Sequence, residues 1–171
     1  VPAGQPFTFV VLGDNRGEPS GELRSVFVEM LGAVRAESPA FILQTGDMIS
    51  GYETEDGPLR RQWAAYVDGV KSSGLLVFHS PGNHDIFDGA SARMYRQLWG
   101  PTWYDFDYGD ARFIALDTST LPNRLGEAQE AALMWVRGEP GMRLRRISRV
   151  RPHVNEGGNA WPEHWDVEII Y

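Results

Sequence analysis

Residues 7–17 read FTFVVLGDNRG, and this stretch sets the pattern on which the rest of the chain is built. Its apolar first half is rich in β-branched and aromatic residues and predicts a buried strand that ends at Gly13. A polar loop carrying Asp14 follows, and Ser20 then stands where a helix N-cap is expected. Apolar side chains recur beyond it at helical spacing, so an amphipathic helix is predicted over 21–36.

The same order of strand, polar loop and helix occurs twice more. The apolar run 40–43 is followed by a polar loop and a helix that closes at Gly74. The run 75–78 leads into PGNHD (81–85) and a shorter helix over 90–99. Three such units predict parallel strands joined by crossover helices, and the carboxyl ends of such strands line the ligand crevice. We therefore expect one pocket to hold the polar side chains Asp14, Asp47, Asn83 and His84.

Beyond the third unit the pattern changes. Alternating residues predict a β-hairpin over 103–116 with a two-residue Gly-Asp connection. A helix is predicted over 126–136, an edge strand over 142–150 and a final strand over 165–171. Residues 143–151 read RLRRISRVR, and we interpret their arginines as the solvated side of the edge strand. The run is short and lacks interleaved aromatic residues, which argues against contact with nucleic acid.

The composition is that of a single packed domain of 171 residues, 42% of them hydrophobic. No apolar run approaches the roughly 20 residues of a membrane span. The absence of cysteine excludes disulfide scaffolds, zinc–thiolate sites and thiol nucleophiles. The net charge of −7 argues against general nucleic-acid binding and is compatible with cation sites. The start VPAGQP suits the residues after signal-peptide cleavage, which favours export to the periplasm or cell exterior, and an expression boundary fits as well.

The polar residues expected at the strand ends have the chemistry of metal ligands. Carboxylate, amide and imidazole groups suit borderline or hard divalent metals, and one carboxylate can bridge two ions roughly 3.5–4 Å apart. A single aspartate in such a loop would by default cap the following backbone. Two aspartates in register with Gly-Asn-His-Asp favour a site instead, whereas His79 is interpreted as a packing residue.

The stretches LGDNR (12–16), TGD (45–47) and PGNHD (81–85), in this order and spacing, resemble the motifs of the calcineurin-like metallophosphoesterases, including their purple acid phosphatase-like branch. With the hairpin and the helix that follows it, the resemblance covers about residues 7–137. It implies an α/β fold, a metallophosphoesterase-like sandwich of two mixed β-sheets flanked by helices. It also implies metal-dependent hydrolysis of a phosphate monoester or diester.

The resemblance further implies a role for each matching residue. Asp14 would bind the first of two metal ions, Asp47 would bridge both, and Asn83 would bind the second. The ions would be Fe, Zn or Mn and would activate a water for in-line phosphoryl transfer. The catalytic residues would be His84, which acts on the substrate, and Asp85, which holds the His84 ring. The substrate would be bound by Arg16, Asn83 and His84.

Two features depart from the family pattern. Arg16 stands where the family usually has a histidine, and a guanidinium binds phosphate, not metal, so a phosphate contact and a loop salt bridge both stay open. The histidine motifs that normally complete both metal shells are missing, and we interpret His153 and His164 as surface residues. We therefore expect a single domain over 1–171 that is interrupted near 137–142. A truly absent set of histidines favours the alternative, a scaffold that binds phosphate or a partner without turnover.

Overall fold

The chain folds into two compact units. The computed structural model describes residues 2, 4–119, 129, 144–147 and 167–170. The larger unit is formed by Pro6–Tyr104 together with Ala115–Gln129. The smaller unit contains Asp105–Ile114 and the strands near the C-terminus.

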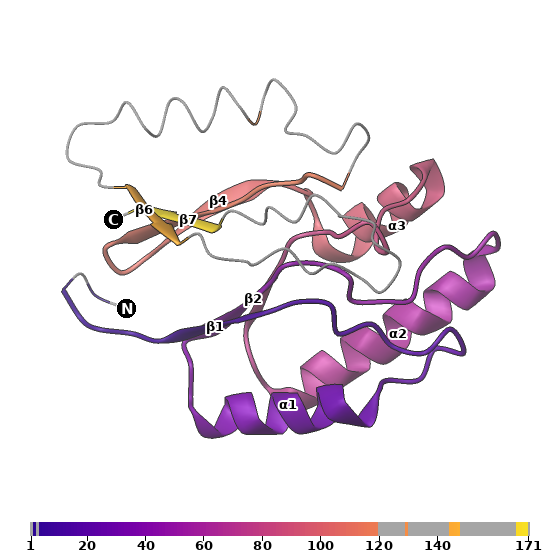
Figure 1. Cartoon of the computed structure of the whole chain (residues 1–171), viewed down its shortest axis with the longest axis horizontal. Helices are drawn as coiled ribbons and strands as arrows, with labels where there is room; N and C mark the ends of the chain where they lie inside the picture. The colour runs from indigo at the N-terminus through magenta and orange to yellow at the C-terminus, as the bar shows by residue number, and fades with distance from the viewer. Residues whose placement is uncertain (1, 3, 120–128, 130–143, 148–166, 171) are drawn as a thin grey trace, which may run out of the picture. The chain divides into compact units, whose positions relative to one another are not determined.

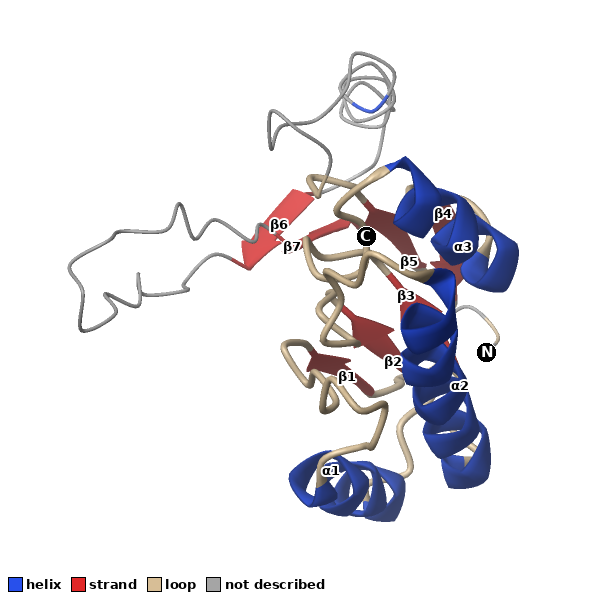
Figure 2. Cartoon of the chain, turned by 90° about the vertical axis from the view of Figure 1, so that its right-hand side faces the viewer, coloured by secondary structure: helices blue, strands red, loops and turns tan. Residues whose placement is uncertain are grey.

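The larger unit is built on a parallel sheet with the strand order β1-β2-β3 (Figure 2). The strands are β1 over Phe9–Leu12, β2 over Phe41–Gln44 and β3 over Val77–His79. They lie within two residues of the positions predicted from the apolar runs. The three parallel strands are thus confirmed, and the polar loops that follow them meet at one edge of this sheet.

Three helices follow the three strands, as the sequence predicts. They are α1 over Ser25–Ala36, α2 over Asp56–Ser73 and α3 over Gly89–Trp99. α2 ends where predicted, because Gly74 adopts a left-handed backbone with a φ angle of 69°. The strand–loop–helix units inferred from the sequence are therefore present in the folded chain.

α1 starts at Ser25 and not at residue 21. Gly21 has a φ angle of 96°, and its N–H donates to the Glu18 carbonyl oxygen at 2.9 Å. This segment therefore forms a turn that a helix cannot include. Ser20 does not cap α1, which begins after the extended Arg24 without a side-chain cap.

The core of the larger unit lies between the sheet and the helices. Strand–helix–strand connections are right-handed, so a strand order that follows the chain places α1 and α2 on the same face of the sheet (Figure 1). The strands contribute Val10, Leu12, Ile42 and Val77 to this core. The helices contribute large buried side chains, among them Phe27, Leu31, Trp63, Tyr66 and Tyr95.

The smaller unit contains a four-stranded sheet with the order β4-β5-β7-β6. Its strands are β4 over Tyr104–Tyr108, β5 over Ala111–Ala115, β6 over Leu144–Ile147 and β7 over Val167–Ile170. β7 pairs antiparallel with β5 and with β6. The predicted hairpin is confirmed with Gly109 and Asp110 between its strands, and the predicted edge strand and final strand are confirmed as β6 and β7.

Helices and two sheets confirm the α/β class predicted from the sequence. The helix predicted over 126–136, apart from Gln129, lies outside the described residues, and so does the interruption expected near 137–142. Within the described part of the chain, no helix is both long and apolar enough to cross a membrane.

His79, at the end of β3, is a packing residue whose titration should destabilise the fold in acid. Its buried ring stacks on Trp99 with 3.9 Å between the centroids, and burial lowers the pKa of His79 to about 4. Between this value and the ordinary pKa of about 6.5, the unfolded chain binds a proton that the folded chain does not, so stability falls as the pH falls.

As the pH falls from about 7.5 to about 5, titration of His79 should therefore lower the free energy of unfolding by about 2 kcal/mol. Urea unfolding of wild type and His79→Phe at both pH values measures the part of the decline that His79 causes. The variant keeps an aromatic ring against Trp99 but cannot titrate, so its decline should be smaller by that amount. An equal decline in both proteins would contradict the prediction.

Candidate active site

Asp14 and Asp47 follow the first two strands and share an uncommon backbone conformation. Their φ angles are 53° and 56°, in the left-handed region that aspartate tolerates better than most residues. The backbone joins their loops, because Thr45 N–H donates to the Leu12 oxygen at 2.8 Å and Asp14 N–H donates to the Gly46 oxygen at 3.1 Å. Both aspartates are therefore positioned at the carboxyl edge of the sheet.

Two glycines allow the loops after β2 and β3 to touch. A Cβ atom on Gly82 would overlap Asp47 Oδ1, and a Cβ atom on Gly46 would overlap the backbone nitrogen of Gly82. Because glycine lacks this atom, the loops approach closely enough for His84 N–H to donate to Asp47 Oδ1 at 3.1 Å. The glycines of the TGD and PGNHD motifs thus bring Asp47 and His84 together.

The His84 ring is held at both of its nitrogen atoms. Arg16 Nη1 lies 2.7 Å from Nε2, and the Ser50 carbonyl oxygen lies 2.6 Å from Nδ1. A guanidinium only donates, so Nε2 must accept from Arg16, and Nδ1 then carries the proton that it donates to Ser50. Asp47 Oδ2 lies 4.0 Å from Nε2. These contacts place the side chains of Arg16, Asp47 and His84 next to one another.

Asp85 does not hold the His84 ring, which corrects the contact expected from the sequence. Its carboxylate is fully buried, and Oδ2 accepts from the N–H groups of Asp47 and Gly82, both at 2.8 Å. Oδ1 accepts from Met48 at 3.0 Å and from Ile49 at 3.4 Å. Asp85 therefore positions the loop that carries Asp47. Burial raises the pKa of Asp85 to about 7, against the opposing effect of these N–H groups.

The charges of the site converge on Asp47. Burial raises the pKa of this carboxyl group, and the nearby Asp14 carboxylate acts in the same direction. The His84 N–H, the His84 ring and the Arg16 guanidinium act in the opposite direction. Asp14 is thus close enough to affect Asp47 electrostatically. Asp14, Arg16 and His84 therefore all lie near the Asp47 carboxyl group.

Asn83 lies at the exposed rim of the site. Its Nδ2 donates to the Tyr52 hydroxyl oxygen at 2.9 Å, and the Tyr52 ring meets the His84 ring edge-on with 4.8 Å between the centroids. Sequence reasoning missed both Ser50 and Tyr52. The available signal was an aromatic residue beside Gly51 in the loop that follows the TGD motif.

Sequence reasoning also missed Asn15, which stands between Asp14 and Arg16 in the sequence. Its side chain is buried, and its Oδ1 accepts a hydrogen bond from Gln44 Nε2. Gln44 ends β2, so this contact ties the first loop to the second strand. A polar residue at the end of a buried strand was the available signal.

Asp14, Asp47 and Asn83 supply donor types that suit a divalent cation, but they are too few for two ions. Asp14 and Asp47 provide two carboxylates that repel each other, and Asn83 provides an amide oxygen, a combination that hard or borderline metals accept. Among the described residues, no group of three His, Cys, Asp or Glu side chains could hold a metal ion. His153 and His164 lie outside those residues.

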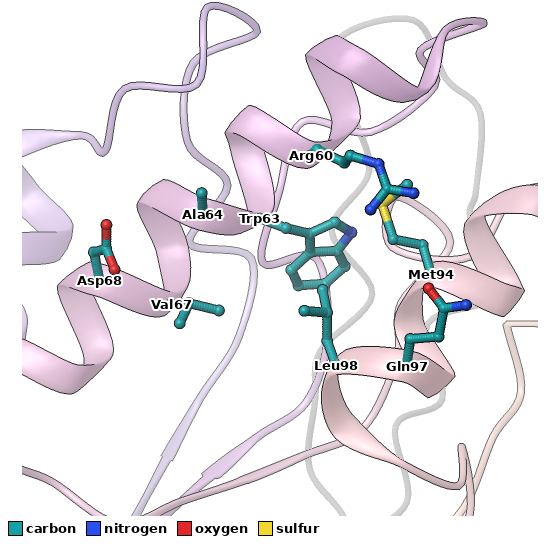
Figure 3. A pocket seen from close by; sticks show the side chains of 8 residues that line it. All are labelled: Arg60, Trp63, Ala64, Val67, Asp68, Met94, Gln97 and Leu98. Atoms are coloured by element: carbon teal, nitrogen blue, oxygen red, sulfur yellow. The ribbon is translucent and has the colours of Figure 1, made fainter.

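A pocket of about 300 Å³ lies between α2 and α3 (Figure 3). Trp63, Met94 and Leu98 form its apolar part, and Arg60, Asp68 and Gln97 lie at its rim. None of its lining residues belongs to the strand-end loops that carry the predicted site residues. This pocket is therefore separate from the candidate active site.

The comparison with family models gives the class of protein that this fold and site define. The model of the calcineurin-like phosphoesterases matches residues 7–167. The chain belongs to this family, whose members are metal-dependent phosphoesterases. A search of curated proteins found no match.

Proposed function

We propose that this protein hydrolyses a phosphate ester with metal ions held by Asp14, Asp47 and Asn83. Family membership supports phosphoesterase chemistry. The observation that carries the proposal is the cluster at the sheet edge, where Arg16 donates to His84 beside the carboxylate of Asp47. An anion-binding cation, a group able to carry a proton and a metal-binding carboxylate are the parts that this reaction needs.

Arg16 binds the phosphoryl group in this proposal. A charged phosphate oxygen accepts from a guanidinium more strongly than a neutral imidazole does, so phosphate competes with His84 for Arg16. His84 Nε2 is then free to face the leaving oxygen of the ester. The Ser50 carbonyl oxygen holds the ring through Nδ1, so Nε2, beside the Asp47 carboxylate, is the nitrogen that exchanges a proton with that oxygen.

The metal ions would be two, of Fe, Zn or Mn, with Asp47 between them. When bound, they would supply Lewis-acid stabilisation and an activated water. Two carboxylates and one amide are too few to complete the shells of two metal ions, so further donors would be needed. The purple acid phosphatase-like branch stays a prediction from the sequence motifs, and these motifs leave the choice between a monoester and a diester open.

The second candidate is a scaffold that binds phosphate without turnover. It is favoured by Arg16, a residue that cannot bind metal, at a position where a metal-binding histidine is expected. It is also favoured by the incomplete ligand set of the described residues. Both candidates use Arg16 for phosphate, so they differ only in metal loading and hydrolysis.

Metal analysis of the purified full chain, combined with assays on generic phosphomonoesters and phosphodiesters, tests the proposal. The protein is stripped with a chelator and then reloaded separately with iron, zinc or manganese. Hydrolysis that disappears with the metal and returns on reloading is the expected result. Phosphate binding without hydrolysis under every metal would establish the second candidate.

Arg16→Ala should weaken phosphate binding about 10- to 100-fold, the value of a charge-assisted hydrogen bond lost to the substrate. The effect should fall on KM and on inhibition by inorganic phosphate more than on kcat. Arg16→Lys keeps the charge but loses the bidentate geometry, and it should give an intermediate value. Unchanged phosphate affinity in the alanine variant would assign Arg16 to a loop contact only.

A further inference from the structure

We propose that Tyr52, together with Phe87, forms an aromatic wall beside His84 that selects esters whose leaving oxygen carries a planar ring. This inference rests on the proposed function, because it places the leaving group next to His84. Tyr52 is 55% exposed, although tyrosine carries a large apolar ring. Its ring lies 4.8 Å from His84 and 5.0 Å from Phe87, measured between centroids.

Tyr52 is held in a conformation that a tyrosine rarely adopts. Its φ angle is 55°, and a bulky residue in the left-handed region is strained. Such strain persists only where neighbours impose it. Gly51 supplies this constraint, because its N–H donates to the buried Gln62 Oε1 at 2.9 Å and its backbone packs directly against the His84 carbonyl oxygen.

The strain does not serve the core, because the side chain that it directs is exposed. The hydroxyl group contacts Asn83, and the ring meets the His84 ring edge-on. Backbone strain that presents an aromatic side chain at a predicted active site is more consistent with ligand recognition than with folding.

The chemistry of the wall indicates its ligand. His84 Nε2 faces Arg16, so a phosphoryl group at Arg16 has its ester oxygen near His84. A ring attached to that oxygen can meet the Tyr52 ring in an offset or edge-on arrangement, which two aromatic rings prefer. The expected substrate class is therefore aryl phosphates, and alkyl phosphates gain nothing from the wall.

Two non-hydrolysable phosphonates test the wall without requiring turnover. Benzylphosphonate replaces the ester oxygen of an aryl phosphate by a methylene group, and cyclohexylmethylphosphonate carries a saturated ring of similar size. Calorimetry on the metal-loaded full chain should show benzylphosphonate binding roughly three- to tenfold more tightly. Tyr52→Ala should abolish this preference, whereas Tyr52→Phe, which keeps the ring, should retain it.

Leu76→Ala is the matched control for loss of an exposed apolar side chain. Leu76 is 54% exposed and precedes β3, at the end of the strand opposite the site, so its variant should keep the preference. Tyr52→Ala retains a Cβ atom and therefore the same backbone strain, and thermal unfolding should show that its fold is kept. Hydrolysis provides the second readout, since Tyr52→Ala should lower kcat/KM for phenyl phosphate and not for ethyl phosphate.

The outcomes separate this inference from the proposed function. Equal binding of both phosphonates by wild type, or an unchanged preference in Tyr52→Ala, would contradict ligand selection by the aromatic wall. Neither result would contradict the proposed phosphate site. Failure of both phosphonates to bind overturns both proposals. A preference that depends on Tyr52, in a protein that hydrolyses no ester under any metal, supports the wall and overturns hydrolysis.

Discussion

Replacing Asp47 by asparagine should remove metal binding and hydrolysis together while leaving the fold intact. Asparagine tolerates the left-handed backbone of this position, and its amide oxygen can still accept from His84 N–H. The change therefore removes little except the negative charge that would hold both cations. Metal stabilisation of the transition state is worth several kcal/mol, so activity should fall by about 10³-fold or more.

The measurement is metal content beside kcat/KM, with His84→Gln as the matched control in the same site. His84 is proposed to act on the substrate and not on the metal. Its variant should therefore keep the metal while turnover falls by about 10²- to 10⁴-fold, the usual range for general acid help. Full metal content in Asp47→Asn would contradict the bridging role of Asp47.

Replacing Asp85 by asparagine should destabilise the protein by about 3 kcal/mol. Four backbone N–H groups converge on the Asp85 carboxylate, two on each oxygen. The asparagine side chain would present its NH₂ group, in place of a carboxylate oxygen, to one pair of these N–H groups. Two buried N–H donors would then lose their acceptor, at a cost of about 1–3 kcal/mol each. The Asp47 loop should loosen as well, because one of these donors is the N–H of Asp47.

Urea unfolding at about pH 8 measures this loss, because Asp85 is then mostly ionised. Asp88→Asn is the matched control, since Asp88 also accepts backbone N–H bonds, from Ala90 and Ser91, but at the exposed start of α3. Asparagine caps helices about as well as aspartate, and one amide oxygen can keep both bonds to Asp88 Oδ1, so this variant should lose well under about 1 kcal/mol. Equal losses in the two variants would show that burial of the Asp85 carboxylate contributes nothing.

Much of the fold could be predicted because the signals that specify it are local. The apolar runs 7–12, 40–43 and 75–78 identify three strands, of which β2 is the most buried, and Gly74 ends α2 where a left-handed residue is needed. A Gly-Asp pair between alternating residues similarly identifies the hairpin of β4 and β5. Each signal depends on a few neighbouring residues, so the unfolded chain already contains it.

The sequence by itself also determined which residues converge, because strands of one parallel sheet end at the same edge. Only the tertiary structure decided their partners. Asp85 binds the backbone of Asp47 and Met48, and Ser50 holds His84, across separations of 38, 37 and 34 residues. A hydrogen bond forms only when its donor and acceptor atoms are positioned to within a few tenths of an ångström. That precision arises when the loops pack against each other, as Gly46 and Gly82 do here, and the residue pattern along the chain does not contain it.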